Sequence, residues 1–342
     1  MNKTGYVYET IFCQHDLPEH PENASRLGAI LDYLTSNDII SQLTRVAARP
    51  ATPNELQRCH HPLYIEMVED TCRYGGGMLD GDTYTNSFSF DAAIQAAGGV
   101  IELTKAVVKG ELDNGFALVR PPGHHAVPSS AMGFCLFGTA AIAARSARRD
   151  LKLERVAVID FDVHHGNGTQ AILNEDPHIF FASSHQYPFY PGTGALREIG
   201  RGPGEGAILN VPLSVMTGDD GIRRLYDEAV FAALRRFEPE LILVSAGYDA
   251  HWQDPLANIG LTLKGYQWLS EGLIALANEI CEGRIVFILE GGYNLEVLAP
   301  GVGNTFRALL GINNYDDPIG KCPWQEPEVD SLLSEIKRVH RL

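Results

Sequence analysis

The sequence has few cysteines, and their spacing argues against two classes of protein. Six cysteines occur in 342 residues, and no two of them form a CxxC pair. Thiolate zinc sites and the frameworks of small disulfide-stabilised proteins need closer and more regular spacing. We therefore expect free thiols in a reducing compartment.

Long apolar runs are also missing. The start of the chain, MNKTGYVYET, lacks the apolar stretch of a secretion signal. No segment approaches the run of about 18 apolar residues that a membrane-spanning helix needs. These absences predict a cytoplasmic protein without a membrane partner.

Positive charge is scarce: 27 Lys and Arg face 43 Asp and Glu, for a formal net charge of −16. This excess disfavours nucleic acid as a partner and favours a cationic ligand, such as a basic peptide or a polyamine. The hydrophobic fraction of 45% is ordinary for a globular protein. No repeat or linker divides the chain, so we expect one domain over residues 1–342.

Short apolar strands alternate with helical segments along most of the chain. This alternation predicts a parallel sheet covered by helices on both faces. The expected strands are 5–12, 115–119, 155–161, 179–182, 208–211, 241–246 and 284–289, and the clearest helices are 91–109, 219–236, 263–281 and 296–310.

Polar, glycine-rich turns follow several of these strands. Ligands bind beyond the carboxyl ends of the strands in such sheets, so we expect the turns to meet at one edge. They are RPPGHH (120–125), DFDVHHGNG (160–168), SSHQ (183–186), SAGYDA (245–250) and EGGYN (290–294).

The stretch RVAVIDFDVHHGNG contains the strongest metal-binding pattern. If the chain stays extended, Asp160, Asp162 and His164 project from one face of it. Taken alone, the pattern is equally compatible with a strand that ends in solvated acids. Asp249, just past another buried strand, offers a third ligand beside Asp162 and His164. Three ligands with an open position are typical of a catalytic zinc site.

Two adjacent histidines, His124 and His125, are candidates for proton transfer. Asp160 is positioned to fix one imidazole, and Asn167 the other without adding charge. Such unequal partners would leave one imidazole cationic and the other free to move protons. Tyr293 is a candidate oxyanion donor. The alternatives are a solvent-exposed histidine pair and a packed core tyrosine.

Two further segments receive structural interpretations. The HPExxxR cluster, with Glu22 and Arg26, is read as a helix N-terminus with an acid near the dipole rather than a catalytic element. The tail 313–342 ends in an amphipathic helix that packs on the same domain or on a partner subunit, which leaves a homo-oligomer open.

Together, RPPGHH, GFCLF, DFDVHHGNGTQ, PGTG, SAGYDAHWQDPLA and EGGYN resemble the zinc-dependent histone deacetylase superfamily in its class II-like branch, which includes acetylpolyamine amidohydrolases. The resemblance runs from about His20 to about Gly311. It implies the arginase/deacetylase fold, a single α/β domain with a central eight-stranded parallel sheet flanked by helices.

The resemblance also implies roles for individual residues. Asp162, His164 and Asp249 resemble the zinc ligands, His125 the general base and acid, His124 its electrostatic partner bonded to Asp160, and Tyr293 the oxyanion donor. Gly133, Phe134 and Tyr190 would line the acyl-lysine tunnel, with Asp82 at its rim. Asp160, Asp162, His164, Ser183 and Ser184 would surround a structural potassium ion.

Several positions distinguish this chain from some members of the family. Asn167 and Glu290 match class II members. Tyr190 replaces the usual Phe, and Gly138 replaces a common Asn. Leu256 stands where polyamine-specific relatives have an acidic gatekeeper, which favours a lysine side chain within a peptide.

The expected function is a zinc-dependent amidohydrolase that removes acetyl or similar acyl groups from lysine side chains. The nearest alternative is a deacetylase of acetylpolyamines or other small acylated amines. Less favoured are a non-hydrolytic acyl-lysine binding module, because Tyr293 is retained, and a two-metal ureohydrolase, because of the tandem histidines. The choice between Zn²⁺ and Fe²⁺ stays open.

Overall fold

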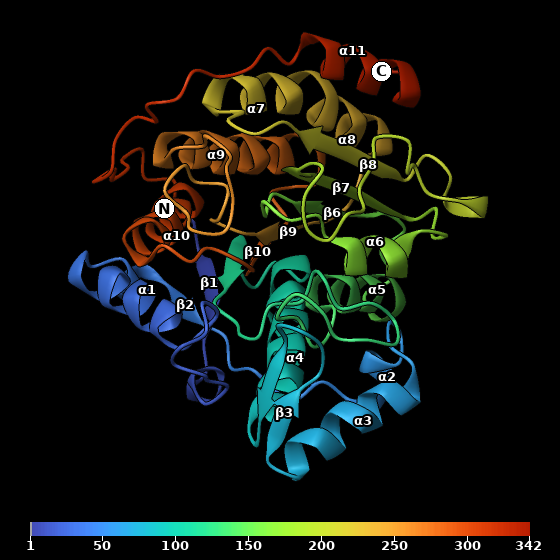
Figure 1. Ribbon diagram of the computed structural model, residues 1–342, viewed down its shortest axis with the longest axis vertical. Helices are drawn as coiled ribbons and strands as arrows, with labels where there is room; N and C mark the ends of the chain where they lie inside the picture. The colour runs from blue at the N-terminus through green and yellow to red at the C-terminus, as the bar shows by residue number, and fades with distance from the viewer. Residues whose placement is uncertain (1) are drawn as a thin grey trace.

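A computed structural model describes residues 2–342 and contains an eight-stranded, wholly parallel sheet (Figure 1). The strand order is β2-β1-β5-β10-β9-β6-β7-β8. The strands are β1 (Thr4–Val7), β2 (Thr44–Arg45), β5 (Asn114–Ala117), β6 (Val156–Asp160), β7 (Ile179–Gln186), β8 (Ile208–Leu213), β9 (Ile242–Ala246) and β10 (Ile285–Leu289). A separate hairpin pairs β3 (Gly76–Met78) with β4 (Tyr84–Asn86). The predicted fold class is confirmed.

Two groups of helices cover the sheet, as the layers in Figure 1 show. Within each group, neighbouring helices pack on one another. One group is α1 (Ser25–Ser36), α7 (Asp219–Leu225), α8 (Phe231–Phe237), α9 (Leu263–Ile280), α10 (Leu295–Leu310) and α11 (Asp330–His340). The other is α2 (Pro53–Leu56), α3 (Pro62–Arg73), α4 (Ser89–Val108), α5 (Thr139–Asp150) and α6 (Asn167–Leu173).

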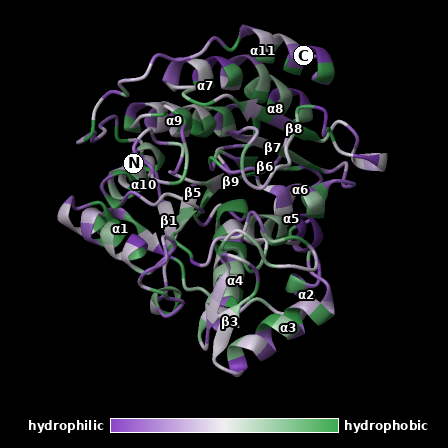
Figure 2. Cartoon of the chain, in the orientation of Figure 1, coloured by the Kyte–Doolittle hydropathy of each residue, from purple (hydrophilic) through white to green (hydrophobic). Residues whose placement is uncertain are grey.

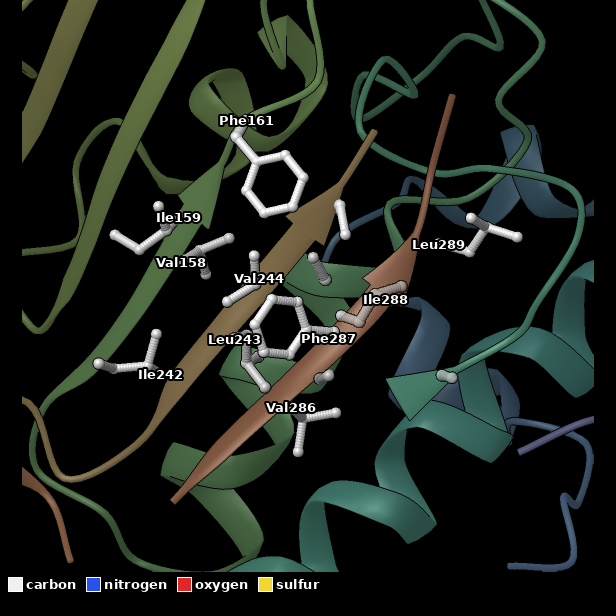
Figure 3. Close-up of a cluster of buried hydrophobic side chains, with 14 of the residues drawn as sticks. Val158, Ile159, Phe161, Ile242, Leu243, Val244, Val286, Phe287, Ile288 and Leu289 are labelled. Carbon is white, nitrogen blue, oxygen red and sulfur yellow. The ribbon is translucent and has the colours of Figure 1, made fainter. Parts of the chain in front are cut away.

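The central strands are apolar on both faces. Figure 3 shows side chains of β6, β9 and β10 packed together, among them Val158, Leu243 and Phe287, all fully buried. Continuous apolar runs fit strands that helices cover on both sides. Outside this core, the peripheral helices carry purple and green stretches side by side, as expected for amphipathic helices (Figure 2).

The C-terminal helix α11 packs on this same domain. Its apolar side chains Leu333 and Ile336 are buried, and the helix contacts β8 and the turn that joins α7 to α8. Of the two interpretations of the tail, the structure therefore shows the intramolecular one.

Some expected elements differ from the structure. SSHQ (183–186) was expected after a strand but lies inside β7, because β8 pairs with it through Gln186. The first strand ends at Val7 and is followed by a 3₁₀ turn at Thr10–Cys13. The polar segment 51–90 contains α2 and α3, which were not predicted. The helix expected at 219–236 contains a π-helical turn at Tyr226–Val230.

Candidate active site

The loop after β6 is folded by its own acidic side chains. The strand ends at Asp160, whose Oδ1 accepts the backbone N–H of Asp162 at 3.1 Å. Asp162 Oδ1 in turn accepts the N–H of His164 at 2.9 Å. The expectation of one extended chain through these three residues was wrong, because these hydrogen bonds bend the chain. Gly166 permits the bend, since a Cβ there would lie 2.2 Å from Asp160 Oδ2.

Three predicted ligands meet beyond the ends of β6 and β9. His164 Nδ1 lies 3.2 Å from both Asp162 Oδ1 and Asp249 Oδ2. All three side chains are buried, and Asp249 Oδ2 has no hydrogen-bond partner among the described residues. Two carboxylates and one imidazole suit Zn²⁺, and an unpartnered buried carboxylate oxygen calls for a cation. The residues present therefore fit a zinc ion.

The protonation of His164 reflects the same negative environment. Burial opposes a charge on the imidazole, but the adjacent carboxylates of Asp162 and Asp249 outweigh it and raise the pKa of His164 to about 10. The two carboxylates thus stabilise positive charge at the point where the three side chains converge.

The two adjacent histidines have different partners. His124 Nδ1 lies 3.1 Å from Asp160 Oδ2, and His125 Nδ1 lies 2.7 Å from Asn167 Oδ1. Burial opposes protonation of both. The carboxylates of Asp162 and Asp160 nevertheless raise the pKa of His124 well above its usual value. Burial and the neighbouring imidazoles of His124 and His164 lower the pKa of His125 well below its usual value. The surroundings therefore favour the cationic form of His124 and the neutral form of His125.

The loop that carries the histidines is fixed from two sides. Glu290, the first residue after β10, accepts the backbone N–H groups of Gly123 and His124. On the other side, the N–H groups of Gly168 and Thr169 in the first turn of α6 donate to the carbonyl of His124. Sequence reasoning noted Glu290 only as a class II feature and missed these contacts, because their donors are backbone N–H groups, which leave no residue-specific signal in the sequence.

A second group of potential ligand atoms contains His124, Cys135 and Glu290. Burial raises the pKa of the Cys135 thiol well above its usual value, so the thiol stays protonated. His124 already bonds Asp160, and both oxygens of Glu290 already accept hydrogen bonds. This cluster is therefore read as part of the support for the histidine loop.

Tyr293 lies in the loop after β10. Its backbone N–H donates to Asp254 Oδ2 at 2.8 Å, and its ring packs edge-on against Phe134, with 5.8 Å between ring centroids. The guanidinium of Arg26 lies over the ring at 5.1 Å. Burial raises the pKa of Tyr293 well above its usual value, so the hydroxyl remains a donor.

Two of the three predicted tunnel residues, Gly133 and Tyr190, lie against His125, and Phe134 lies against Tyr293. A Cβ on Gly133 would lie 2.3 Å from His125 Cδ2, so only glycine lets this loop approach the imidazole. The Tyr190 ring meets the His125 ring edge-on at 5.2 Å. Phe189, which sequence reasoning missed, stacks on the imidazole of His164 at 5.8 Å. The sequence signal for Phe189 was its position next to Tyr190 in the same turn.

The rim acid Asp82 lies in a loop that contacts the same region. The Phe134 N–H donates to Thr83 Oγ1 at 3.1 Å. His20 Nε2 bonds the carbonyl of Asp82 at 3.1 Å, and its ring packs edge-on against Phe134. Burial and the neighbouring Asp80 raise the pKa of Asp82.

Leu256 and the two serines of the predicted potassium site, Ser183 and Ser184, bond residues around the site. The Leu256 N–H donates to Asp254 Oδ1, so Asp254 connects this residue to Tyr293. Ser183 pairs with Asp160 across β7 and β6, and its hydroxyl bonds His185. The Ser184 hydroxyl bonds that of Tyr226 at 2.8 Å.

The HPExxxR cluster does more than begin a helix. Glu22 is fully buried and forms ion pairs with Arg26 and Arg120, and these arginines lower its pKa well below the usual value despite its burial. Arg26 also donates to the carbonyls of Glu290 and Gly292 at 2.6 and 2.8 Å. The helix-dipole interpretation was therefore incomplete, because Glu22 acts mainly as the counterion of two buried arginines.

The fold and the sequence together define the class of this protein. The model of the histone deacetylase domain matches residues 20–309, so the chain belongs to the histone deacetylase family. The resemblance inferred from the motifs, including its class II-like character, is confirmed.

Individual relatives cover nearly the whole chain. It is 42% identical to "Histone deacetylase 14, chloroplastic" of Arabidopsis thaliana, over 96% of this chain and 82% of that protein. It is 36% identical to "Probable deacetylase" of Archaeoglobus fulgidus, over 98% and 97% of the two chains. The crystal structure of the HDA15 HD domain superposes with a TM-score of 0.91 at 33% identity, over 99% and 95% of the two chains.

None of the helices within residues 2–342 is long and apolar enough to cross a membrane. The cytoplasmic location stays a prediction, because a named relative is described as chloroplastic.

Proposed function

We propose that this deacetylase-family chain is a zinc-dependent amidohydrolase that removes acetyl or similar acyl groups from lysine side chains of peptides or proteins. The observation that carries the proposal is the buried set of Asp162, His164 and Asp249 beside two imidazoles with different partners, Asp160 for His124 and Asn167 for His125. A zinc ion held by those three side chains would supply a Lewis acid for the acyl carbonyl.

The protein's own residues account for the proton transfers. The Nδ1–H of His125 donates to Asn167 Oδ1, so Nε2 is the free acceptor and takes the proton of the attacking water. His125 then returns this proton to the departing amine. The cationic His124, paired with Asp160, stabilises the negative charge that develops. The Tyr293 hydroxyl donates to the developing oxyanion.

Substrate binding rests on the aromatic residues beside His125 and Tyr293. Phe134 and Tyr190 would contact the methylene stem of the acylated lysine, and each buried CH₂ contributes about 0.8 kcal/mol. Asp82 would accept hydrogen bonds from the substrate backbone. A structural potassium ion near Asp160, Ser183 and Ser184 belongs to the same proposal.

The test is hydrolysis of an acetyl-lysine peptide, followed by release of acetate. We expect turnover by the wild type, loss of activity on chelation, recovery on adding Zn²⁺ or Fe²⁺, and no detectable turnover by His125→Ala. Full activity of a metal-free preparation would contradict the zinc mechanism.

A second candidate substrate is a small acylated amine such as an acetylated polyamine. The net charge of −16, together with Asp80 and Asp82 near Tyr190, favours a cationic substrate. Competition between acetylspermidine and an acetyl-lysine tripeptide separates the two. We expect the tripeptide to be preferred and Leu256→Glu to shift the preference towards acetylspermidine.

A further inference from the structure

Glu290 is a buried carboxylate whose oxygens are fully used as acceptors. It is 0% exposed and follows β10, whose last residue, Leu289, is labelled in Figure 3. Its Oε2 accepts the N–H groups of Gly123 at 2.7 Å and His124 at 3.2 Å. Its Oε1 accepts the hydroxyl of Ser245, on the adjacent strand β9, at 3.1 Å.

The backbone around Glu290 is fixed independently of this carboxylate. Arg26 donates to the carbonyls of Glu290 and Gly292. The Gly291 N–H donates to Asp162 Oδ2 at 2.8 Å, so the loop also contacts the ligand set. The Glu290 side chain therefore extends from a fixed loop to the loop of the two histidines.

These contacts connect two loops that carry candidate catalytic residues. The loop that begins at Glu290 carries Tyr293, and the loop bound by its carboxylate carries His124 and His125. Removing the carboxylate leaves two buried backbone N–H groups without their acceptor, which the chain can satisfy only by moving the histidine loop. A shift of about 1 Å in such a group costs on the order of 10²-fold in rate.

We propose that Glu290 is a positioning residue that sets the placement of His124 and His125 relative to Tyr293, and that it acts through its hydrogen bonds to the backbone of the histidine loop. This inference rests on the proposed function. It assigns to Glu290 no contact with substrate.

The experiment compares two substitutions of similar length. In Glu290→Gln the amide oxygen still accepts both N–H groups and the amide nitrogen donates to Ser245, so we expect kcat to fall no more than about threefold. Glu290→Met fills the same space without an acceptor, and we expect kcat to fall about 10²-fold with KM within about threefold. Each kcat is referred to the folded fraction measured by circular dichroism and gel filtration.

Val286→Ala is the matched control for lost stability. Val286 is fully buried on the same strand, and its truncation lowers the melting temperature without touching either loop. We expect its kcat to match the wild type. Should Glu290→Met fail to fold, Glu290→Asp replaces it, because the shorter carboxylate cannot reach Gly123 and Ser245 together. We then expect kcat to fall about tenfold.

The outcomes separate this inference from the proposed function. Absence of wild-type turnover on every acylated amine contradicts the function itself. With an active wild type, a Met or Asp variant that loses no more kcat than Val286→Ala overturns the positioning role. A Gln variant as slow as the Met variant also overturns it, since charge rather than backbone hydrogen bonding would then matter.

Discussion

At the scale of single residues, the tyrosine of the site is supported mainly through its ring and backbone. Arg26 and Phe134 pack on the ring, and Asp254 binds the backbone N–H. These contacts leave the hydroxyl out, and burial keeps it protonated. A substitution that deletes only the hydroxyl should therefore change the reaction rate without changing how the ring packs.

We predict that Tyr293→Phe lowers kcat for an acetyl-lysine peptide by about 10²-fold or more, the effect of losing one oxyanion donor. The ring contacts survive, so the melting temperature should stay within about 1 °C of the wild type. Steady-state kinetics and thermal unfolding of both proteins measure the two effects. Unchanged kcat would remove Tyr293 from the mechanism.

Motifs pointed to the candidate site residues and to the pairing of His124 with Asp160 and of His125 with Asn167, whereas the contacts of Glu290 were not anticipated. Asp162, His164 and Asp249 follow apolar strands, and parallel strands bring their carboxyl ends to one edge. The bond from Glu290 to Gly123 depends on side-chain length and on the exact path of two loops. Neither property leaves a periodic signal in the sequence.

At the scale of elements, helix α6 and the histidine loop act as one unit. The first turn of α6 donates two N–H groups to the carbonyl of His124, and Asn167 at its start bonds His125. Long apolar strands and helices were predicted from their periodicity. Helix α2 was missed because it has only four residues and depends on tertiary packing. Helix α3 has twelve residues, and its buried residues Tyr64, Ile65, Val68 and Cys72 follow a helical spacing that was overlooked within a polar segment.

We predict that Gly168→Ala lowers kcat at least tenfold. A Cβ at this position would lie 2.4 Å from the Ala126 carbonyl oxygen, so α6 and the histidine loop must separate. Substitution of the exposed Ala171 by Ser, on the same helix, is the control and should leave kcat unchanged. Equal rates for the two variants would show that the loop adapts without disturbing the histidines.

At the scale of the whole molecule, stability should depend on pH through buried neutral histidines. Burial lowers the pKa of His60, His251 and His340 to about 4 each. Between that value and the usual 6.5, the unfolded chain binds more protons than the folded one. These three histidines therefore do not reduce the free energy of unfolding above pH 6.5, and they reduce it progressively as the pH falls towards 4.

We predict that the contribution of His60 to the free energy of unfolding is lost between pH 6.5 and 4. Buried carboxyls act in the opposite direction, because burial raises the pKa of Asp254 to about 7 and the folded state then binds more protons there than the unfolded one. The loss from His60 amounts to about 3 kcal/mol, because one pKa unit corresponds to about 1.4 kcal/mol. The melting temperature of His60→Gln should rise relative to that of the wild type as the pH falls from 6.5 to 4, since an amide can still bond Val127 and Gly138 as the imidazole does. His178→Gln, at an exposed position, should keep the wild-type slope. Parallel profiles for all three proteins would contradict this assignment.

The net charge of −16 should also affect how fast the molecule binds a charged substrate. An acidic surface attracts cationic peptides over distances that salt screens, since the Debye length falls from about 10 Å at 0.1 M to about 3 Å at 1 M. We predict that kcat/KM for an acetyl-lysine peptide flanked by arginines falls at least threefold over this range. The same peptide flanked by serines should change little, because only the long-range attraction is screened. If both peptides respond alike, salt acts on the enzyme itself, and the acidic surface has no part in substrate capture.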